Sequence, residues 1–174
     1  MDLTPKLTPK DPMTTNSSDA FRKQLARALD WEDAHVGFDA AVKGLPAALR
    51  GRKPAGFPHS PWELLEHLRL AQRDILDFCV DSKYVAGRFP DDYWPKSPQP
   101  PKARSWSESV AAFRADRRAV KELVADRKRD LMAQIPHGEG QSYLREVLLV
   151  IDHGAYHVGQ LVMARQLLGA WPPG

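Results

Sequence analysis

The sequence predicts an all-α protein: a four-helix bundle with up-down-down-up topology and one long crossover between its second and third helices. Four segments carry apolar residues at spacings of three, four and seven, the period of an amphipathic helix. No segment alternates apolar and polar residues over enough positions to predict a strand. A proline-rich connection separates the second and third segments, and it is long enough to return the chain along a bundle.

The first helix is predicted over residues 18–43. Its apolar positions recur at helical spacings: Phe21, Leu25, Ala28, Val36 and Val42. Residues 1–17 are polar and contain prolines, so we expect them to form a flexible N-terminal arm. Residues 18–174 then make a single domain, a length typical of one compact unit. Gly44 and Pro46 end or kink the helix.

Both middle helices begin with the sequence of a capping box, in which a serine N-cap and a glutamate three residues later satisfy backbone N–H groups. In the second helix these residues are Ser60 and Glu63. In the third helix, predicted over residues 105–131, they are Ser105 and Glu108. The second helix carries one apolar stripe that includes a histidine: Leu64, His67, Leu68, Ala71, Ile75 and Phe78.

The fourth helix is predicted over residues 141–168, where Gly169 caps its C-terminus and Pro172 prevents it from resuming. Between the second and third helices, five prolines in residues 90–101 keep the chain extended. The connection at residues 84–103 can therefore reach about 60 Å, against roughly 30 Å for a 20-residue helix. The two helices that it joins can accordingly run parallel.

Composition places the protein among soluble cytoplasmic proteins. The longest aliphatic run, residues 147–151, is far too short to span a membrane, and the N-terminal sequence lacks the apolar core of a secretory signal. The single cysteine, Cys79, excludes an intrachain disulfide and fits a reducing compartment. The net charge is +3, and acidic residues interrupt the basic stretch at 114–129, which is typical of a solvated helix face. We therefore expect neither a membrane nor a nucleic acid as a partner.

The strongest chemical signal is a pair of histidines in the fourth helix. His153 and His157 are one helical turn apart, so their side chains share a face, with Cβ atoms about 5–6 Å apart. At that spacing two imidazole nitrogens can bind one ion at about 2.0–2.1 Å each. The pair lies in an apolar stretch, where a buried imidazole must bind a ligand or find a hydrogen-bond partner.

A third ligand is expected from the second helix, where His67 lies on the apolar stripe. In the up-down-down-up arrangement, His67 lies about 10 Å below the top of the bundle. The pair on the fourth helix lies about 18–24 Å above the bottom of a bundle roughly 35–40 Å tall, which is close to the same level. If the two helices were parallel, the sites would miss each other by roughly 10 Å. We therefore predict that His67, His153 and His157 bind one divalent metal ion.

Four other side chains are candidates near this site. By the same counting, His35 in the first helix is expected at the level of the three histidines. It is then an auxiliary proton carrier or substrate contact; the alternative is a surface histidine. Asp152 either orients one of the ligands or forms a surface ion pair on the adjacent face. Tyr93 and Trp94 in the crossover either pack it against the bundle or roof part of a pocket.

Three protein ligands leave one coordination position open for water or substrate, as in catalytic zinc sites. Neutral imidazoles without a thiolate favour zinc or nickel, with iron in its Fe(II) form as a further option. The sequence lacks H-E-x-x-H, which excludes a zincin protease. Its one E-x-x-H motif, Glu32 with His35, is too few for a di-iron bundle. The site is therefore expected to hold a single ion.

Two segments, SPWELLEHLRLAQRDILDF and REVLLVIDHGAYHVGQLVMARQLLG, resemble the DinB-like superfamily of bacterial metal-binding four-helix bundles. The crossover DDYWPKSPQPP and the turn IPHGEGQ are similar to one branch of it, and the resemblance covers about residues 29–171. It implies that a histidine of the second helix and the H-x-x-x-H pair of the fourth bind the metal, here His67, His153 and His157. It also implies a homodimer and, in some members, S-transferase or isomerase reactions with a low-molecular-weight thiol such as mycothiol, bacillithiol or glutathione.

The sequence leaves two functions open. In the first, the protein is a metal-dependent enzyme that activates a low-molecular-weight thiol or water for a transferase-like or hydrolase-like reaction on a small-molecule substrate. In the second, it is a non-catalytic stress-response module whose ion only stiffens the bundle. A histidine cluster that packs in the core without any metal is the remaining alternative.

Overall fold

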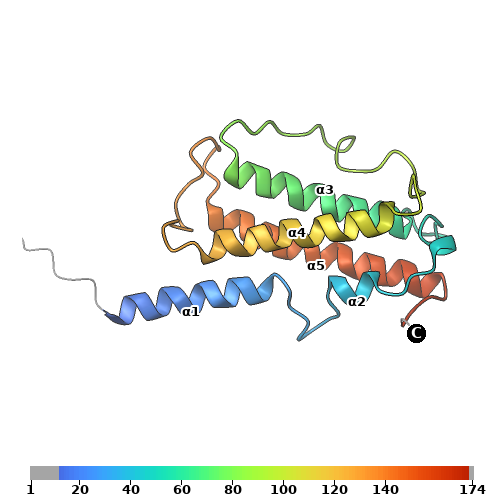
Figure 1. Ribbon diagram of the computed structural model, residues 1–174, viewed down its shortest axis with the longest axis horizontal. Coiled ribbons are helices and arrows are strands. Elements are labelled where there is room, and N and C mark those ends of the chain that lie inside the picture. The colour runs from blue at the N-terminus through green and yellow to red at the C-terminus, as the bar shows by residue number, and fades with distance from the viewer. Residues whose placement is uncertain (1–11, 173–174) are drawn as a thin grey trace, which may run out of the picture.

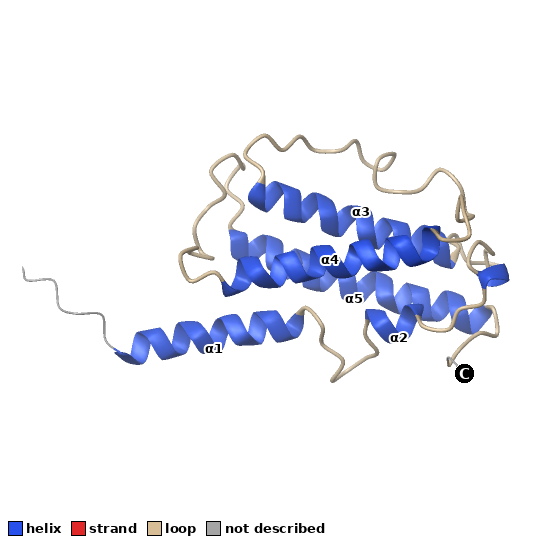
Figure 2. Ribbon diagram, viewed as in Figure 1, coloured by secondary structure: helices blue, strands red, loops and turns tan. Residues whose placement is uncertain are grey.

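The computed structural model describes residues 12–172, and over that range it is helical without a β-strand (Figure 2). This confirms the all-α prediction. The elements are α1 (Pro12–Ala28), α2 (Phe38–Val42), the 3₁₀ turn η1 (Ala47–Leu49), α3 (Pro61–Val80), α4 (Ser105–Ala125) and α5 (Tyr143–Leu167).

The helices lie side by side along one axis of the molecule. α3 packs against both α4 and α5, α1 packs against α4, and the short α2 packs against α5. In Figure 1, α3 and α4 run in one direction while α1 and α5 run in the other. Because α3 and α4 point the same way, the connection at residues 81–104 travels along the length of the helices before α4 begins (Figure 1).

Buried apolar side chains form two clusters along this axis. The α2-side cluster gathers residues of α2, α3, α4 and the second half of α5, among them Val42, Leu65, Phe113 and Leu161. The α1-side cluster gathers residues of α1, α3, α4 and the first half of α5, among them Leu25, Leu76, Val124 and Val150. In the sequence of α3, α4 and α5, polar residues stand between the members of the two clusters: Gln72, Asp116, Arg117, His153 and His157.

The predicted first helix is wrong in its second half, because residues 29–37 form a loop between α1 and α2. Contacts with α4 explain the break. Nη1 of Arg117 donates a hydrogen bond to the carbonyl oxygen of Leu29, and Lys121 forms an ion pair with Asp30. A carbonyl that accepts from another helix no longer needs the next turn of its own helix.

The third predicted helix ends early, at Ala125. Oδ1 of Asp126 accepts a hydrogen bond from the backbone N–H of Lys128 at 2.9 Å, a local contact that replaces the next helical turn. At the other end of the chain, α1 begins at Pro12, inside the predicted flexible arm. Residues 1–11 of that arm lie outside the described residues.

One of the two predicted capping boxes forms. At α3, the side chain of Ser60 accepts from the backbone N–H of Glu63 at 3.2 Å, and the Glu63 carboxylate accepts from the backbone N–H of Ser60 at 2.7 Å. At α4 the prediction is wrong. Oγ of Ser105 instead accepts from the backbone N–H of Lys102 at 3.2 Å, and Glu108 forms an ion pair. The α3 capping box fixes where α3 begins and therefore the position of His67 in its second turn.

By length and composition, α5 is the one helix among the described residues that could cross a membrane. Core helices of soluble proteins pass the same test, and α5 packs against α2 and α3 and carries buried polar residues, including Glu146 and Arg165. Its C-terminus is capped as predicted: Gly169 has a φ of 68°, and its N–H donates to the carbonyl oxygen of Gln166 at 3.0 Å. We therefore treat α5 as an internal helix of this domain.

Candidate metal centre

Three histidine side chains from α3 and α5 converge on one point. His67 comes from the second turn of α3, and His153 and His157 are one turn apart on α5. Nε2 of His67 lies 3.1 Å from Nε2 of His157 and 3.1 Å from Nε2 of His153. One nitrogen from each of the three rings lies within 4.8 Å of the other two. The structure thus brings together the three residues that the sequence singled out.

The nitrogen spacing fits the binding of one ion. If two nitrogens 3.1 Å apart each bind a cation at about 2.0–2.1 Å, the angle at the cation is about 95–100°. That value lies between the right angle of an octahedral site and the roughly 109° of a tetrahedral one. Both geometries are compatible with three protein ligands and at least one further position.

Hydrogen bonds at the opposite ring nitrogens determine the protonation of two imidazoles. Nδ1 of His67 lies 2.8 Å from the carbonyl oxygen of Tyr93, and Nδ1 of His157 lies 2.7 Å from Oε1 of Gln160. Because these oxygens only accept, both Nδ1 atoms carry the proton, and both Nε2 atoms present lone pairs. Two lone pairs that face each other at 3.1 Å repel unless a cation or a proton lies between them.

The environment opposes protonation of the cluster. Burial, together with the neighbouring His67 ring, lowers the pKa of His153 to about 4. Burial, followed by the other two imidazoles, lowers the pKa of His157 to about 4 as well. Burial also lowers the pKa of His67, although the hydrogen bond to Tyr93 partly offsets it. At neutral pH the rings are therefore uncharged, which is the form that binds a metal ion.

The crossover at residues 81–104 forms part of this site. The indole of Trp94 stacks on the imidazole of His67, with ring centroids 3.9 Å apart and an interplanar angle of 3°. It also stacks on His59, with centroids 4.2 Å apart. The sequence left open whether Tyr93 and Trp94 pack the crossover against the bundle or roof a pocket. The structure packs both residues against His67. The imidazole of His67 is thus held by one hydrogen bond and one stacking contact.

Two predicted auxiliary residues lie elsewhere. His35 is exposed on the loop at residues 29–37, where its Nδ1 lies 3.0 Å from the carbonyl oxygen of Val36. The continuous helix assumed for this segment does not form, and the exposed ring matches the surface alternative for His35. Asp152 is exposed on α5 and, within the described residues, makes no hydrogen bond to a histidine ring.

Two residues near the site were not expected from the sequence. Gln160 accepts the Nδ1 hydrogen bond of His157, and its Nε2 in turn donates to the hydroxyl of Tyr156 at 3.2 Å. The three-residue spacing from His157 puts Gln160 on the same helix face, so that contact could have been proposed. The contact of His59 with Trp94 joins two loops that are distant in sequence, and no local pattern indicates it.

A family model described as the DinB superfamily matches residues 30–161 of the 174-residue chain, a segment that contains all three converging histidines. No curated protein and no solved structure matches the chain.

Proposed function

Because this chain belongs to the DinB superfamily, we propose that it binds one divalent metal ion through the Nε2 atoms of His67, His153 and His157. The observation that carries the proposal is the 3.1 Å separation of Nε2 atoms on His67 and His157, whose Nδ1 protons are both donated to oxygen acceptors. Such a pair is stabilised by a cation between its lone pairs, and the low pKa values of His153 and His157 oppose a proton in that place. Three neutral imidazoles without a thiolate favour zinc or nickel, with Fe(II) as a further option.

We further propose that the centre catalyses a reaction of a small molecule. Three protein ligands leave room for a fourth, and a divalent ion held there lowers the pKa of a water or thiol that binds it. The part played by the chain is to keep the three imidazoles uncharged and aimed at one point. The Tyr93 carbonyl and Gln160 hold two of the rings, and Trp94 covers one face of His67. A low-molecular-weight thiol is the proposed co-substrate, with water as the alternative.

Metal analysis of the purified protein tests the binding proposal. The protein is produced without a histidine tag, loaded with zinc or nickel, desalted and analysed by inductively coupled plasma mass spectrometry. We expect one ion per chain in the natural sequence and far less in His67→Ala, His153→Ala and His157→Ala. His137→Ala, which removes a histidine outside the cluster, is the control and should retain one ion. Full occupancy in all three cluster variants would rule the site out.

A rate measurement tests the catalytic proposal. Metal-loaded protein, metal-free protein and His153→Ala are compared in the conjugation of several low-molecular-weight thiols to 1-chloro-2,4-dinitrobenzene, with hydrolysis of an activated ester as the water-dependent reaction. We expect a rate above background only for the loaded natural sequence. Equal rates for all three samples would show that the metal has no catalytic role in these reactions.

A structural ion in a stress-response module is the second candidate. It is favoured by the position of the three histidines, which bring side chains of α3 and α5 together at one point. An ion bound there would cross-link these two helices. This candidate predicts that metal raises the melting temperature in proportion to its binding free energy while all catalytic rates stay at background.

The proposal includes the wider setting expected from the family. We propose an up-down-down-up four-helix bundle of α1, α3, α4 and α5 that acts as a soluble cytoplasmic homodimer, with a small-molecule substrate or thiol and without nucleic-acid or membrane partners. Exposed apolar side chains on α5, Leu148, Tyr156 and Met163, support a second copy as the partner. Light scattering coupled to gel filtration measures the mass in solution, and a monomer at micromolar concentration would contradict the dimer.

A further inference from the structure

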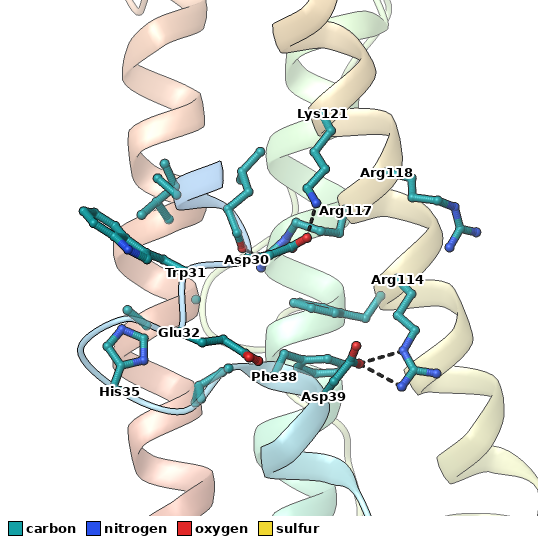
Figure 3. Close-up of a pocket in the computed structure, with 18 residues that line it drawn as sticks. Asp30, Trp31, Glu32, His35, Phe38, Asp39, Arg114, Arg117, Arg118 and Lys121 are labelled. Carbon is teal, nitrogen blue, oxygen red and sulfur yellow. Dashed lines mark hydrogen bonds and ion pairs between the residues drawn. The ribbon is translucent and has the colours of Figure 1, made fainter. Parts of the chain in front are cut away.

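A cavity of about 280 Å³ lies between α4, α5 and the loop at residues 29–37 (Figure 3). We infer that this cavity is a second ligand site, for an apolar organic anion whose acidic group is bound by Arg117. None of the three clustered histidines lines it. Gly154 and Val158, each one residue after a histidine of the cluster, do line it, so the cavity and the metal centre lie on adjacent faces of α5.

The apolar part of the wall suits a ring system. Phe38 from α2 stacks on Phe113 from α4, with ring centroids 3.9 Å apart, and both rings line the cavity. Ile151, Ala155 and Val158 of α5 form the facing wall. The volume is at the small end of ligand pockets, which fits a body of one or two rings with one acidic group.

Arg117 is the most deeply placed cation of the wall, with a side chain only 12% exposed. Its Nε donates to Oε1 of Gln72 at 2.6 Å, and its Nη1 donates to the carbonyl oxygen of Leu29. The third nitrogen, Nη2, lies beside Gly154, where a Cβ atom would come within 3.2 Å of it. Within the described residues Nη2 donates no hydrogen bond, and because Gly154 and Arg117 both line the cavity, we assign Nη2 as the donor to the ligand.

The guanidinium of Arg117 lies over the ring of Phe113, 4.8 Å from its centroid, and the nearby carboxylates are shared with other cations. The carboxylate of Asp30 lies 3.8 Å away and is shared with Lys121. The carboxylate of Asp39 pairs with Arg114 at 2.7 Å, as Figure 3 shows. Burial lowers the pKa of Arg117 to about 10, and the carboxylates of Asp30 and Asp39 offset this only in part. A ligand anion would supply the charge-assisted hydrogen bond that Asp30, at 3.8 Å, does not form with Arg117.

The carboxylate of Glu32, on the loop, would repel an anion in the cavity. Removing it therefore tests whether the ligand is negatively charged. Glu32 is exposed, lines the cavity and forms no ion pair within residues 12–172. In Figure 3 its carboxylate points from the loop toward Phe38. Removing this charge should tighten the binding of an anion and weaken the binding of a cation.

Isothermal titration of the full-length, metal-loaded protein with 2-naphthoate tests the site, with uncharged 2-naphthamide as the matched probe. We expect the acid to bind on the order of tenfold or more tightly than the amide, since a hydrogen bond to a charged group is lost in the amide. Ala155→Phe, which fills the cavity from an exposed position of α5, should abolish binding of both probes. Ala111→Phe, at an exposed position of α4 outside the cavity, should leave both affinities within twofold.

Two charge variants complete the test. Arg117→Gln should bring the affinity for 2-naphthoate down to that for 2-naphthamide, and Glu32→Gln should raise it severalfold. Arg117 also binds the carbonyl oxygen of Leu29 at the end of α1, so Arg117→Gln is first checked for folding. If this variant is unfolded, Glu32→Gln and Ala155→Phe test the proposal. Failure of 2-naphthoate to bind at millimolar concentration, equal affinities for acid and amide, undiminished binding to Ala155→Phe, or weaker binding to Glu32→Gln would each overturn the proposal.

Discussion

The indole ring of Trp94 lies almost parallel to the imidazole ring of His67, with centroids 3.9 Å apart and 3° between their planes. The two residues belong to different segments, since His67 is in α3 and Trp94 is in the crossover at residues 81–104. The carbonyl oxygen of Tyr93, the residue before Trp94, accepts a hydrogen bond from the same imidazole. The long crossover is therefore part of the candidate metal centre as well as a connection.

The first prediction concerns this stacking contact. Trp94→Ala should weaken zinc binding by about tenfold, because an imidazole that loses its supporting contacts must be ordered by the metal itself. The affinity can be measured by competition with a chromophoric chelator. Phe89→Ala, on the same connection but 78% exposed, is the matched control and should bind zinc like the natural sequence. Equal losses in both variants would mean that the crossover acts only through general stability.

The second prediction concerns the hydrogen bond that orients His157. Gln160→Leu removes the oxygen that accepts from Nδ1 and should weaken zinc binding by about 10- to 100-fold. Gln160→Glu should retain or strengthen binding, since a carboxylate is the better acceptor. Gln166→Leu changes an exposed glutamine of the same helix and is the control. Unaltered affinity in Gln160→Leu would show that this contact is not needed to orient the ring.

The third prediction concerns the stability of the metal-free protein at different pH values. In the folded protein His153 and His157 have pKa values of about 4, below the ordinary value of 6.5. As the pH falls through 6.5 the unfolded chain takes up protons that the folded protein does not, so the free energy of unfolding decreases until about pH 4. The melting temperature should therefore fall between pH 7.5 and 5.5. The double variant His153→Ala/His157→Ala should show a smaller fall, and an equal fall would contradict the assignment.

The fourth prediction concerns Arg165, whose side chain is fully buried. Its Nη1 donates to the carbonyl oxygens of Ala41 at 2.6 Å and Lys43 at 2.8 Å, and its Nη2 donates to Ala170 at 3.0 Å. Arg165→Met leaves these carbonyls without a donor and should lower the free energy of unfolding by about 3 kcal/mol. Urea titration measures the change. Arg118→Met, at an exposed arginine of α4, should cost less than about 0.5 kcal/mol, and similar losses would refute the role of these contacts.

The fifth prediction concerns Cys79, which is 5% exposed in the α1-side cluster. Burial, with a smaller contribution from Glu146, raises the pKa of its thiol to about 12. At pH 8 only about one molecule in 10⁴ then carries the reactive thiolate. We expect 5,5′-dithiobis(2-nitrobenzoic acid) to label the folded protein far more slowly than the protein in guanidinium chloride. Rapid labelling of the folded protein would show that this part of the core opens easily.

The helical class and the pairing of two histidines could be read from local patterns. Helical periodicity, the capping box at Ser60 and the glycine at the end of α5 each act over a few neighbouring residues, so their consequences do not depend on the rest of the chain. The same holds for His153 and His157, because one turn of a helix places them on one face whatever surrounds it. Locating His67 beside them required an assumed bundle topology as well.

Contacts between distant segments decided the remaining features. The hydrogen bond from Arg117 to the carbonyl oxygen of Leu29 ends α1, so that His35 lies on an exposed loop. The stacking of Trp94 on His67 joins the crossover to α3. Local preferences for helix over loop amount to only a few tenths of a kcal/mol per residue, whereas one buried hydrogen bond contributes about 1 kcal/mol. The helical class and the pairing of His153 with His157 were therefore determined by the sequence itself, whereas the surroundings of each candidate ligand and the cavity beside them were determined by tertiary packing.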